Sequence, residues 1–331
     1  MAAKQSLVLI TDRFSTEAWV RLETTSFLRI EKAAEPTLEK ADLSEVAGLI
    51  IRSRTKINAA LLKRAPKLQV IVTTTSGFDH IDLAATEAHG VTVMFTPEAN
   101  VQSAMELTWA LVLAGSRKVV GAHKAVKAGD WNRDLLLGNE LEGKTYGIIG
   151  FGRIGKRVAQ LAHAFGMKTI AFDPYLDEDE FFKFKTPRVS LEELLRTSDV
   201  ISIHVPLTAE TKGMFNSSRF ECIRNGVILV NTSRGLVISE QDLITALKKG
   251  WIGACGLDVF EKEPLPRDSQ LLNFQNVILT PHVGANTEEA FLKASMFAAQ
   301  KTIQFFHDGT ASDTLPPKAA WYGAEPFKSS H

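Results

Sequence analysis

The sequence predicts an α/β protein with two domains, each built on a doubly wound parallel sheet. Three observations carry this prediction. Short apolar runs of β-forming residues alternate with helical patterns in two series, and a long helical pattern at residues 100–129 separates the two. Strands that are apolar along nearly their whole length are typical of a parallel sheet covered on both faces. A chain of 331 residues is also too long for one ordinary core.

The first series predicts five strands with helical segments between several of them. The strands are expected at residues 6–11, 27–30, 48–53, 68–74 and 91–95. The long pattern that follows contains Ser103 with Glu106 three residues later, an arrangement typical of a capping box. We therefore expect the helix that leads into the second domain to begin near Ser103.

The second series predicts six strands, the number in a Rossmann-type doubly wound sheet. They are expected at residues 145–150, 168–173, 200–205, 226–231, 254–259 and 276–281. A last helical pattern at residues 288–309 is expected to cross back to the first domain. The Rossmann-type domain then covers residues 100–291, and the substrate domain, discontinuous and flavodoxin-like, covers residues 1–99 and 292–331. Within the latter, residues 310–331 are proline-rich and resemble an extended arm.

Composition excludes several classes of partner. The 38 basic and 38 acidic residues cancel, so nothing favours nucleic acid or a charged membrane surface. No apolar run reaches the roughly 18 residues of a membrane span, and the N-terminal stretch is too short for a signal peptide. Cys222 and Cys255 lack metal-ligand spacing and lie in apolar segments, which indicates buried thiols and no metal site. A cytoplasmic location is expected.

A dinucleotide fingerprint opens the second series. Gly150, Gly152 and Gly155 follow a predicted strand with G-x-G-x-x-G spacing and start a helix, and Asp173 ends the next strand. Glycines permit the tight turn and the close approach of a pyrophosphate, which binds at the helix N-terminus. The carboxylate of Asp173 can accept hydrogen bonds from ribose hydroxyls and repels a 2′-phosphate. The segment that follows, "PYLDEDE", adds four acidic residues and no Arg or Lys that could bind such a phosphate. NAD is therefore favoured over NADP.

Polar side chains also gather at the strand ends of this domain, where ligands of open α/β sheets bind. They are His204, Arg234, Asp258 and His282, with Glu263 shortly after Asp258. Taken singly, each has a structural explanation: a strand-end histidine, an ion pair, a turn residue, a loop histidine and a surface acid. For His204 the structural explanation is the better one.

Taken together, the other residues suit hydride transfer between a nicotinamide and a small acid. A histidine carries a proton near neutral pH, and a neighbouring carboxylate holds it protonated and fixes its tautomer. An arginine binds a substrate carboxylate through two parallel hydrogen bonds and polarises the adjacent carbonyl. The sequence therefore predicts an acid/base site at this edge.

In its motifs the chain resembles the D-2-hydroxyacid dehydrogenases, and within them the D-3-phosphoglycerate dehydrogenase branch. The likeness covers roughly residues 5–309, through "GIIGFGRIG", "HVPLTAETKGMFN", "LVNTSRGLVISEQDL", "GACGLDVFEKEP" and "LTPHVGAN". The resemblance implies that Arg234 anchors the substrate carboxylate, His282 is the acid/base and Glu263 is its partner.

The resemblance also implies a set of cofactor and substrate contacts. For NAD these are Arg153 and Ile154 at the pyrophosphate, Asp173 at the adenosine ribose, Val205 and Pro206 beside the adenine, Thr232 and Ser233 beside a ribose, and Asp258 at the nicotinamide amide. Gly284, after His282, is expected to let the cofactor come close. For the substrate they are the Ser76 and Gly77 amides, together with Arg52, Ser53 and Asn100, beside Arg234 and His282.

Two departures from the branch bear on the substrate. The segment before Ser76 reads Val72-Thr73-Thr74-Thr75, where phosphoglycerate dehydrogenases usually carry an arginine, although Arg52 and Arg54 remain. No regulatory amino-acid-binding domain is recognised after residue 309, so feedback by serine is not expected. We expect 3-phosphoglycerate as substrate, narrowly ahead of hydroxypyruvate and glyoxylate.

Two further expectations concern other roles of the chain. An NAD-sensing protein similar to a co-repressor is the alternative from another class, although the complete catalytic trio argues against it. The resemblance also suggests a homodimer formed through residues 100–129, where "TWALVLAG" is very apolar for a solvent face. Burial of that segment within its own chain explains it almost as well.

Overall fold

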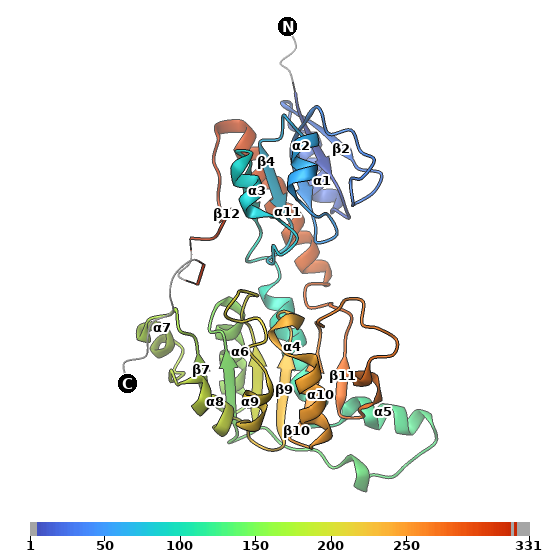
Figure 1. The fold of residues 1–331 in the computed structure, drawn as a ribbon, viewed down its shortest axis with the longest axis vertical. Helices are drawn as coiled ribbons and strands as arrows, with labels where there is room; N and C mark the ends of the chain where they lie inside the picture. Colours follow the sequence, from blue (N-terminus) through green and yellow to red (C-terminus); the bar gives the residue numbers. More distant parts are fainter. Residues whose placement is uncertain (1–4, 319–320, 323–331) are drawn as a thin grey trace. The chain divides into compact units, whose positions relative to one another are not determined.

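The computed structural model describes residues 5–318, 321 and 322 (Figure 1). The chain divides into two compact units. Unit 1 comprises the chain up to Val101 together with the segment that begins at Ala285, and unit 2 comprises Gln102–Gly284. The boundary expected at residue 292 lies inside a helix that starts at Glu288, so that helix belongs to unit 1 throughout.

Unit 1 contains a six-stranded sheet in the order β12-β5-β4-β3-β1-β2. Its strands are β1 (Ser6–Ile10), β2 (Leu28–Lys32), β3 (Val46–Ile51), β4 (Val70–Thr73), β5 (Thr92–Phe95) and β12 (Thr314–Leu315). Its helices are α1 (Thr16–Glu23), α2 (Ala59–Arg64), α3 (Leu83–Ala88) and α11 (Glu288–Asp308). The five predicted strands are all present and parallel, in the flavodoxin-like order. Only β12 was not predicted, and it pairs antiparallel with β5.

Unit 2 contains a second six-stranded sheet, in the order β11-β10-β9-β8-β6-β7. Its strands are β6 (Thr145–Ile149), β7 (Lys168–Phe172), β8 (Val200–Ile203), β9 (Val227–Asn231), β10 (Ile252–Leu257) and β11 (Val277–Leu279). Its helices are α5 (Val119–Lys127), α6 (Arg153–Ala164), α7 (Glu178–Lys183), α8 (Leu191–Thr197), α9 (Ser217–Glu221) and α10 (Glu240–Lys248), with 3₁₀ turns η1 (Asp134–Leu136), η2 (Gly235–Val237) and η3 (Gln270–Asn273). The six predicted strands are confirmed.

The third strand of a Rossmann-type order is reduced in unit 2 to a single bridge. Arg188 pairs in parallel with Ala171 on the outer edge of β7. Pro187, just before it, has no N–H to give to a ladder, which restricts this segment to one edge contact. Counting the bridge, the strand order begins in the Rossmann manner, 3-2-1-4-5-6.

Each sheet is covered on both faces. In unit 2, Ile148 and Val230 belong to one apolar cluster, whereas their neighbours Ile149 and Leu229 belong to another on the opposite face. The two clusters of unit 1 divide Val8 and Leu9 in the same way. This alternation places apolar side chains on both faces of every inner strand, as the sequence predicted.

The long helical pattern is two helices rather than one. Helix α4 (Val101–Ser116) and α5 are separated at Lys118, whose φ of +50° breaks the helical path. The helix start expected at Ser103 is wrong, because α4 already begins at Val101 and Ser103 lies buried in its first turn. Within the part of the chain that the structure describes, none of the helices combines the length and the apolarity needed to cross a bilayer.

Candidate active site

The glycine loop between β6 and α6 has three glycines with three different duties. Gly150 has a φ of +88°, and a Cβ there would lie 2.7 Å from the carbonyl oxygen of His204. A Cβ on Gly155 would collide with the carbonyl oxygen of Gly150, so Gly155 lets the helix pack against the loop. By contrast, a Cβ on Gly152 would meet open space. The loop is therefore closely packed at Gly150 and Gly155 and has free space at Gly152.

Gly152 is also the N-cap of α6, and no side chain caps this helix. The first backbone N–H groups of an α-helix have no acceptor within the helix itself, which suits the start of α6 to an outside acceptor. Partial positive charge at a helix N-terminus favours a phosphate there. The loop and helix fit the pyrophosphate of a dinucleotide, as the sequence predicted.

Asp173 is fixed beside this loop by two backbone amides. Its carboxylate accepts hydrogen bonds from the N–H of Phe151, at 2.9 Å, and of Tyr175, at 3.0 Å. Burial raises the pKa of Asp173, and these two bonds, with the charges of Arg188 and Lys156, work against that rise. The sequence did not reveal Arg188 as a neighbour, because the bridge to β7 brings it in from a later segment.

The loop after β8 contains the predicted adenine-side residues. The side chain of Val205 lies against Gly150, and Pro206 accepts a hydrogen bond from the Thr211 hydroxyl at 2.6 Å. His204 is bound through Nε2 to the Ser202 hydroxyl at 2.8 Å, and burial lowers its pKa to about 3. A histidine that stays neutral is a poor proton donor, so this geometry favours the structural explanation of His204.

The turn that presents Arg234 is built on Asn231, which is completely buried at the end of β9. The Asn231 side-chain amide donates to the carbonyl of Arg234 at 2.9 Å, and its side-chain oxygen accepts from the N–H and the hydroxyl of Ser233. Thr232 is tied to Thr108 of α4 at 2.9 Å. The backbone of the turn that carries Arg234 is therefore held by Asn231, and the preceding Thr232 is held by α4.

His282 and Glu263 form a direct pair. Nδ1 of His282 lies 2.7 Å from Oε2 of Glu263, and the other carboxylate oxygen accepts from the Phe260 N–H at 3.1 Å. Burial acts to raise the pKa of Glu263, but His282, Phe260 and the charge of Arg234 outweigh it and hold that pKa below its usual value. The charge of Glu263 is thus stabilised where it faces the imidazole.

Asp258 holds the loop that carries His282. It is completely buried, and its carboxylate accepts from the Thr280 hydroxyl at 2.7 Å and from the N–H groups of Val283 and Gly284 at 2.8 Å each. The His282 N–H donates to the Asp258 carbonyl at 2.9 Å. These bonds fix His282 at a φ of +53°, a region that histidine tolerates better than most residues. Asp258 is thus engaged with the loop, where the resemblance implied a contact with nicotinamide.

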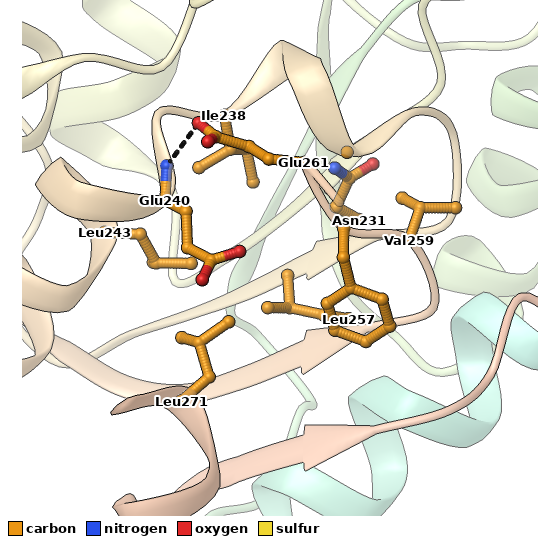
Figure 2. Close-up of a pocket in the computed structure, with 10 residues that line it drawn as sticks. Asn231, Ile238, Glu240, Leu243, Leu257, Val259, Glu261 and Leu271 are labelled. Carbon is orange, nitrogen blue, oxygen red and sulfur yellow. Dashed lines mark hydrogen bonds between the residues drawn. The ribbon is translucent and has the colours of Figure 1, made fainter. Parts of the chain in front are cut away.

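Gly235 joins the Arg234 turn to the loop of Glu263. A Cβ on Gly235 would collide with the backbone of Phe260, so only glycine lets the two segments pack this closely. Figure 2 shows the small pocket next to this contact, which is lined by Asn231, Leu257 and Glu240 among others. Three strand-end segments, those of Arg234, Asp258–Glu263 and His282, are therefore locked together by hydrogen bonds and packing.

In unit 1, the expected substrate residues also lie at the carboxyl ends of strands. Arg52 and the exposed Ser53 follow β3, and Ser76 and Gly77 follow β4. The Ser76 hydroxyl donates to the side-chain oxygen of Asn100. Because β3 and β4 are neighbours, these groups share one edge of the sheet.

A further arginine on this edge was missed. Arg13 follows β1, and the guanidinium groups of Arg13 and Arg52 lie 5.2 and 5.7 Å from the ring centre of Phe291. Arg54 is bound to Asp12 at 2.9 Å, so it is less available to a ligand than the sequence suggested. Arg13 carried no usable signal, because only the fold brings it beside Arg52.

The fold and these two edges define a class of protein. Residues 109–284 match the family model described as "D-isomer specific 2-hydroxyacid dehydrogenase, NAD binding domain". The chain belongs to this family, and the matched part of unit 2 is its NAD-binding domain.

Particular relatives narrow the comparison. The chain is 38% identical to D-3-phosphoglycerate dehydrogenase of Bacillus subtilis over 90% of its own length, but it spans only 56% of that protein. It is 37% identical to glyoxylate reductase of Aeropyrum pernix, covering 95% of this chain and 91% of the relative. The crystal structure of D-lactate dehydrogenase from Aquifex aeolicus, complexed with NAD and lactic acid, matches with a TM-score of 0.82 and 32% identity, covering 91% of this chain and 96% of that one.

Proposed function

We propose that the chain is an NAD-dependent oxidoreductase that interconverts a small D-2-hydroxy acid and the corresponding 2-oxo acid. The 2.7 Å contact between His282 and Glu263 is the observation that carries the proposal. A carboxylate held ionised against an imidazole stabilises the protonated form of that imidazole. A histidine placed in this way at a strand end is equipped to exchange a proton with a substrate.

The side chains divide the reaction between them. The nicotinamide, when bound, supplies or accepts the hydride at C2 of the substrate. Because Nδ1 of His282 is engaged by Glu263, Nε2 is the ring nitrogen that gives the proton to the carbonyl oxygen, or takes it back in the other direction. Arg234 binds the substrate carboxylate, and Asn231 and Asp258 position Arg234 and His282.

We propose 3-phosphoglycerate as the substrate, ahead of hydroxypyruvate and glyoxylate. The pair of Arg13 and Arg52 supports this choice, since two guanidinium groups over Phe291 would neutralise a second anionic group. Arg52 also lies next to the strand that leads to Ser76 and Gly77, whose amides are proposed to hold the carboxylate. Because the chain is also similar to glyoxylate reductase of Aeropyrum pernix, hydroxypyruvate and glyoxylate are tested as alternative substrates.

The activity is tested by following NADH absorbance with a panel of 2-oxo acids, with NAD reduction by 3-phosphoglycerate alongside. His282→Ala is expected to lower kcat by about 100-fold or more, the usual contribution of a general acid, and to leave the Kd for NADH unchanged. His307→Ala, a change of an exposed histidine of unit 1, is the matched control. Full turnover by His282→Ala would contradict the proposal. NADH binding without turnover on any acid would favour an NAD-sensing protein.

We propose a homodimer whose interface includes residues 131–137 rather than the apolar segment expected from the sequence. The apolar segment "TWALVLAG" lies within its own unit, where Trp109 stacks on Phe165 and Leu111 packs on Gly256. The exposed apolar side chains come later, and Trp131, Leu135 and Leu137 are 76%, 70% and 79% exposed. Such a patch next to α5 is typical of an interface.

Light scattering tests the oligomeric state. Trp131→Glu is expected to turn a dimer into a monomer, and Phe182→Glu is the matched control, since Phe182 is 85% exposed on α7. A monomer in the wild-type protein would overturn the dimer. The cytoplasmic location stays a prediction, for fractionation of cells to test.

A further inference from the structure

One side-chain bridge between two loops of unit 2 has no part in the function proposed above. Tyr175 lies in the loop after β7, and Glu210 lies in the loop after β8. The Tyr175 hydroxyl donates a hydrogen bond to the Glu210 carboxylate. Strands β7 and β8 flank β6 on opposite sides, so the bridge connects loops on either side of the glycine loop.

The two bridged loops carry the residues expected around the adenosine of NAD. Tyr175 donates its own N–H to Asp173, the proposed ribose ligand, at 3.0 Å. On the other side, Thr211, next to Glu210, donates to the carbonyl of Pro206 at 2.6 Å and accepts from the Thr208 N–H at 2.8 Å. The bridge therefore connects the loop of Asp173, expected at the ribose, with the loop of Pro206, expected at the adenine.

The spacing of the loops suits a nucleoside. Neighbouring strands lie about 4.8 Å apart, so the ends of β7 and β8 are separated by roughly 10 Å. Burial, together with the hydrogen bond and charge of Glu210, raises the pKa of Tyr175 to about 12. The hydroxyl therefore keeps its proton at neutral pH and remains a donor to Glu210.

We propose that Tyr175 and Glu210 form a strap across the adenosine end of the cofactor site, and that this strap strengthens the binding of NAD(H). Both are positioning residues, because they act by holding Asp173 and the Val205–Pro206 segment in place. The inference depends on NAD binding alone and is independent of the substrate.

The test measures cofactor binding without turnover. Tyr175→Phe and Glu210→Ala are each expected to raise the Kd for NADH, read from its fluorescence, by about three- to tenfold, the range for one net hydrogen bond. The double variant is expected to bind no more weakly than either single variant, because both changes break the same bond. Binding of AMP should weaken in parallel, whereas binding of nicotinamide mononucleotide should not change.

Glu192→Ala is the matched control, since it removes a surface carboxylate from α8 that pairs only with Arg196 among the described residues. An unchanged or tighter Kd for NADH in both variants would overturn the strap. Additive losses in the double variant, or equal weakening of nicotinamide mononucleotide, would overturn it as well. Because no step requires turnover, a failure of the proposed catalytic function leaves this result readable.

Discussion

The two units share one strand order and differ at one helix end. In both, five strands run parallel in the order 5-4-3-1-2, counted within the unit, and a helix follows the first strand. In unit 1 that helix is α1, and its N-cap Ser15 accepts a hydrogen bond from the Ala18 N–H with its own side chain. In unit 2 it is α6, and its N-cap Gly152 offers no side chain.

This difference separates the expected phosphate site from a structural turn. The first N–H groups of any α-helix have no acceptor within the helix itself. Ser15 accepts from one such N–H group of α1 and is itself buried, whereas no side chain caps α6 and a Cβ on Gly152 would meet open space. Topology places both helix ends alike, and we propose that the residue at the N-cap decides which of them receives a cofactor.

The largest expected effect comes from making unit 2 resemble unit 1. In Gly152→Ser, the new Cβ meets open space and the backbone, at φ −75° and ψ −154°, is one that serine adopts. The hydroxyl should cap α6 and compete with the pyrophosphate. The Kd for NADH is expected to rise by about 10- to 100-fold, while the free energy of unfolding changes by only a few tenths of a kcal/mol.

Calorimetric titration with NADH and urea unfolding measure these two quantities. Gly155→Ala is the contrasting variant, because its Cβ would collide with the carbonyl of Gly150 and should destabilise the fold itself. Undiminished NADH affinity in Gly152→Ser would show that the open helix end is not the phosphate site.

The second prediction concerns the charged edge of unit 1. Arg52→Met keeps the apolar stem and removes the guanidinium over Phe291. The kcat/KM for 3-phosphoglycerate is expected to fall by about tenfold or more, with a smaller fall for hydroxypyruvate, because a charge-assisted hydrogen bond is lost only with the phosphorylated acid. Arg54→Met is the control, because the guanidinium of Arg54 is already bound to Asp12. Equal losses on both acids would remove the argument for a phosphate.

A smaller effect is expected at the capped helix end of unit 1. Ser15→Ala should lower the free energy of unfolding by about 1 kcal/mol, since the side chain that caps α1 is lost. The Kd for NADH should not change, in contrast to Gly152→Ser. Weakened NADH binding in Ser15→Ala would contradict the division of duties between the two helix ends.

The smallest effect concerns Glu263 and pH. Glu263→Gln is expected to lower the free energy of unfolding at pH 7 by less than about 1 kcal/mol, because 37% of the Glu263 side chain is exposed and water screens the pair. The pKa of Glu263 is lowered in the folded state, so its contribution is complete above the usual value of 4.5 and is lost as pH falls through the folded value. Urea unfolding of both proteins across this range should show the difference shrinking in acid. A difference that grows in acid would be inconsistent with this pairing.

The sequence by itself determined the strands of both sheets, the glycine loop and the strand-end residues. These features are local, because a short run of apolar residues predicts a strand and the G-x-G-x-x-G motif forms within a single turn. Because parallel strands end at one edge, Arg234, Glu263 and His282 could also be expected near one another before any contact was known. The length and apolarity of residues 100–129 did not reveal the break at Lys118, since both halves have helical periodicity.

Only the tertiary structure decided how those residues are held. Asp258 binds the Thr280 hydroxyl before His282 and two backbone N–H groups after it. Gly235 fits against Phe260, and Arg13 meets Arg52 over Phe291. Each of these contacts joins segments that are distant in the chain, and no periodic pattern encodes such a distance. The local pattern named the groups proposed to take part in the reaction, and the packing of one strand end on another fixed their geometry.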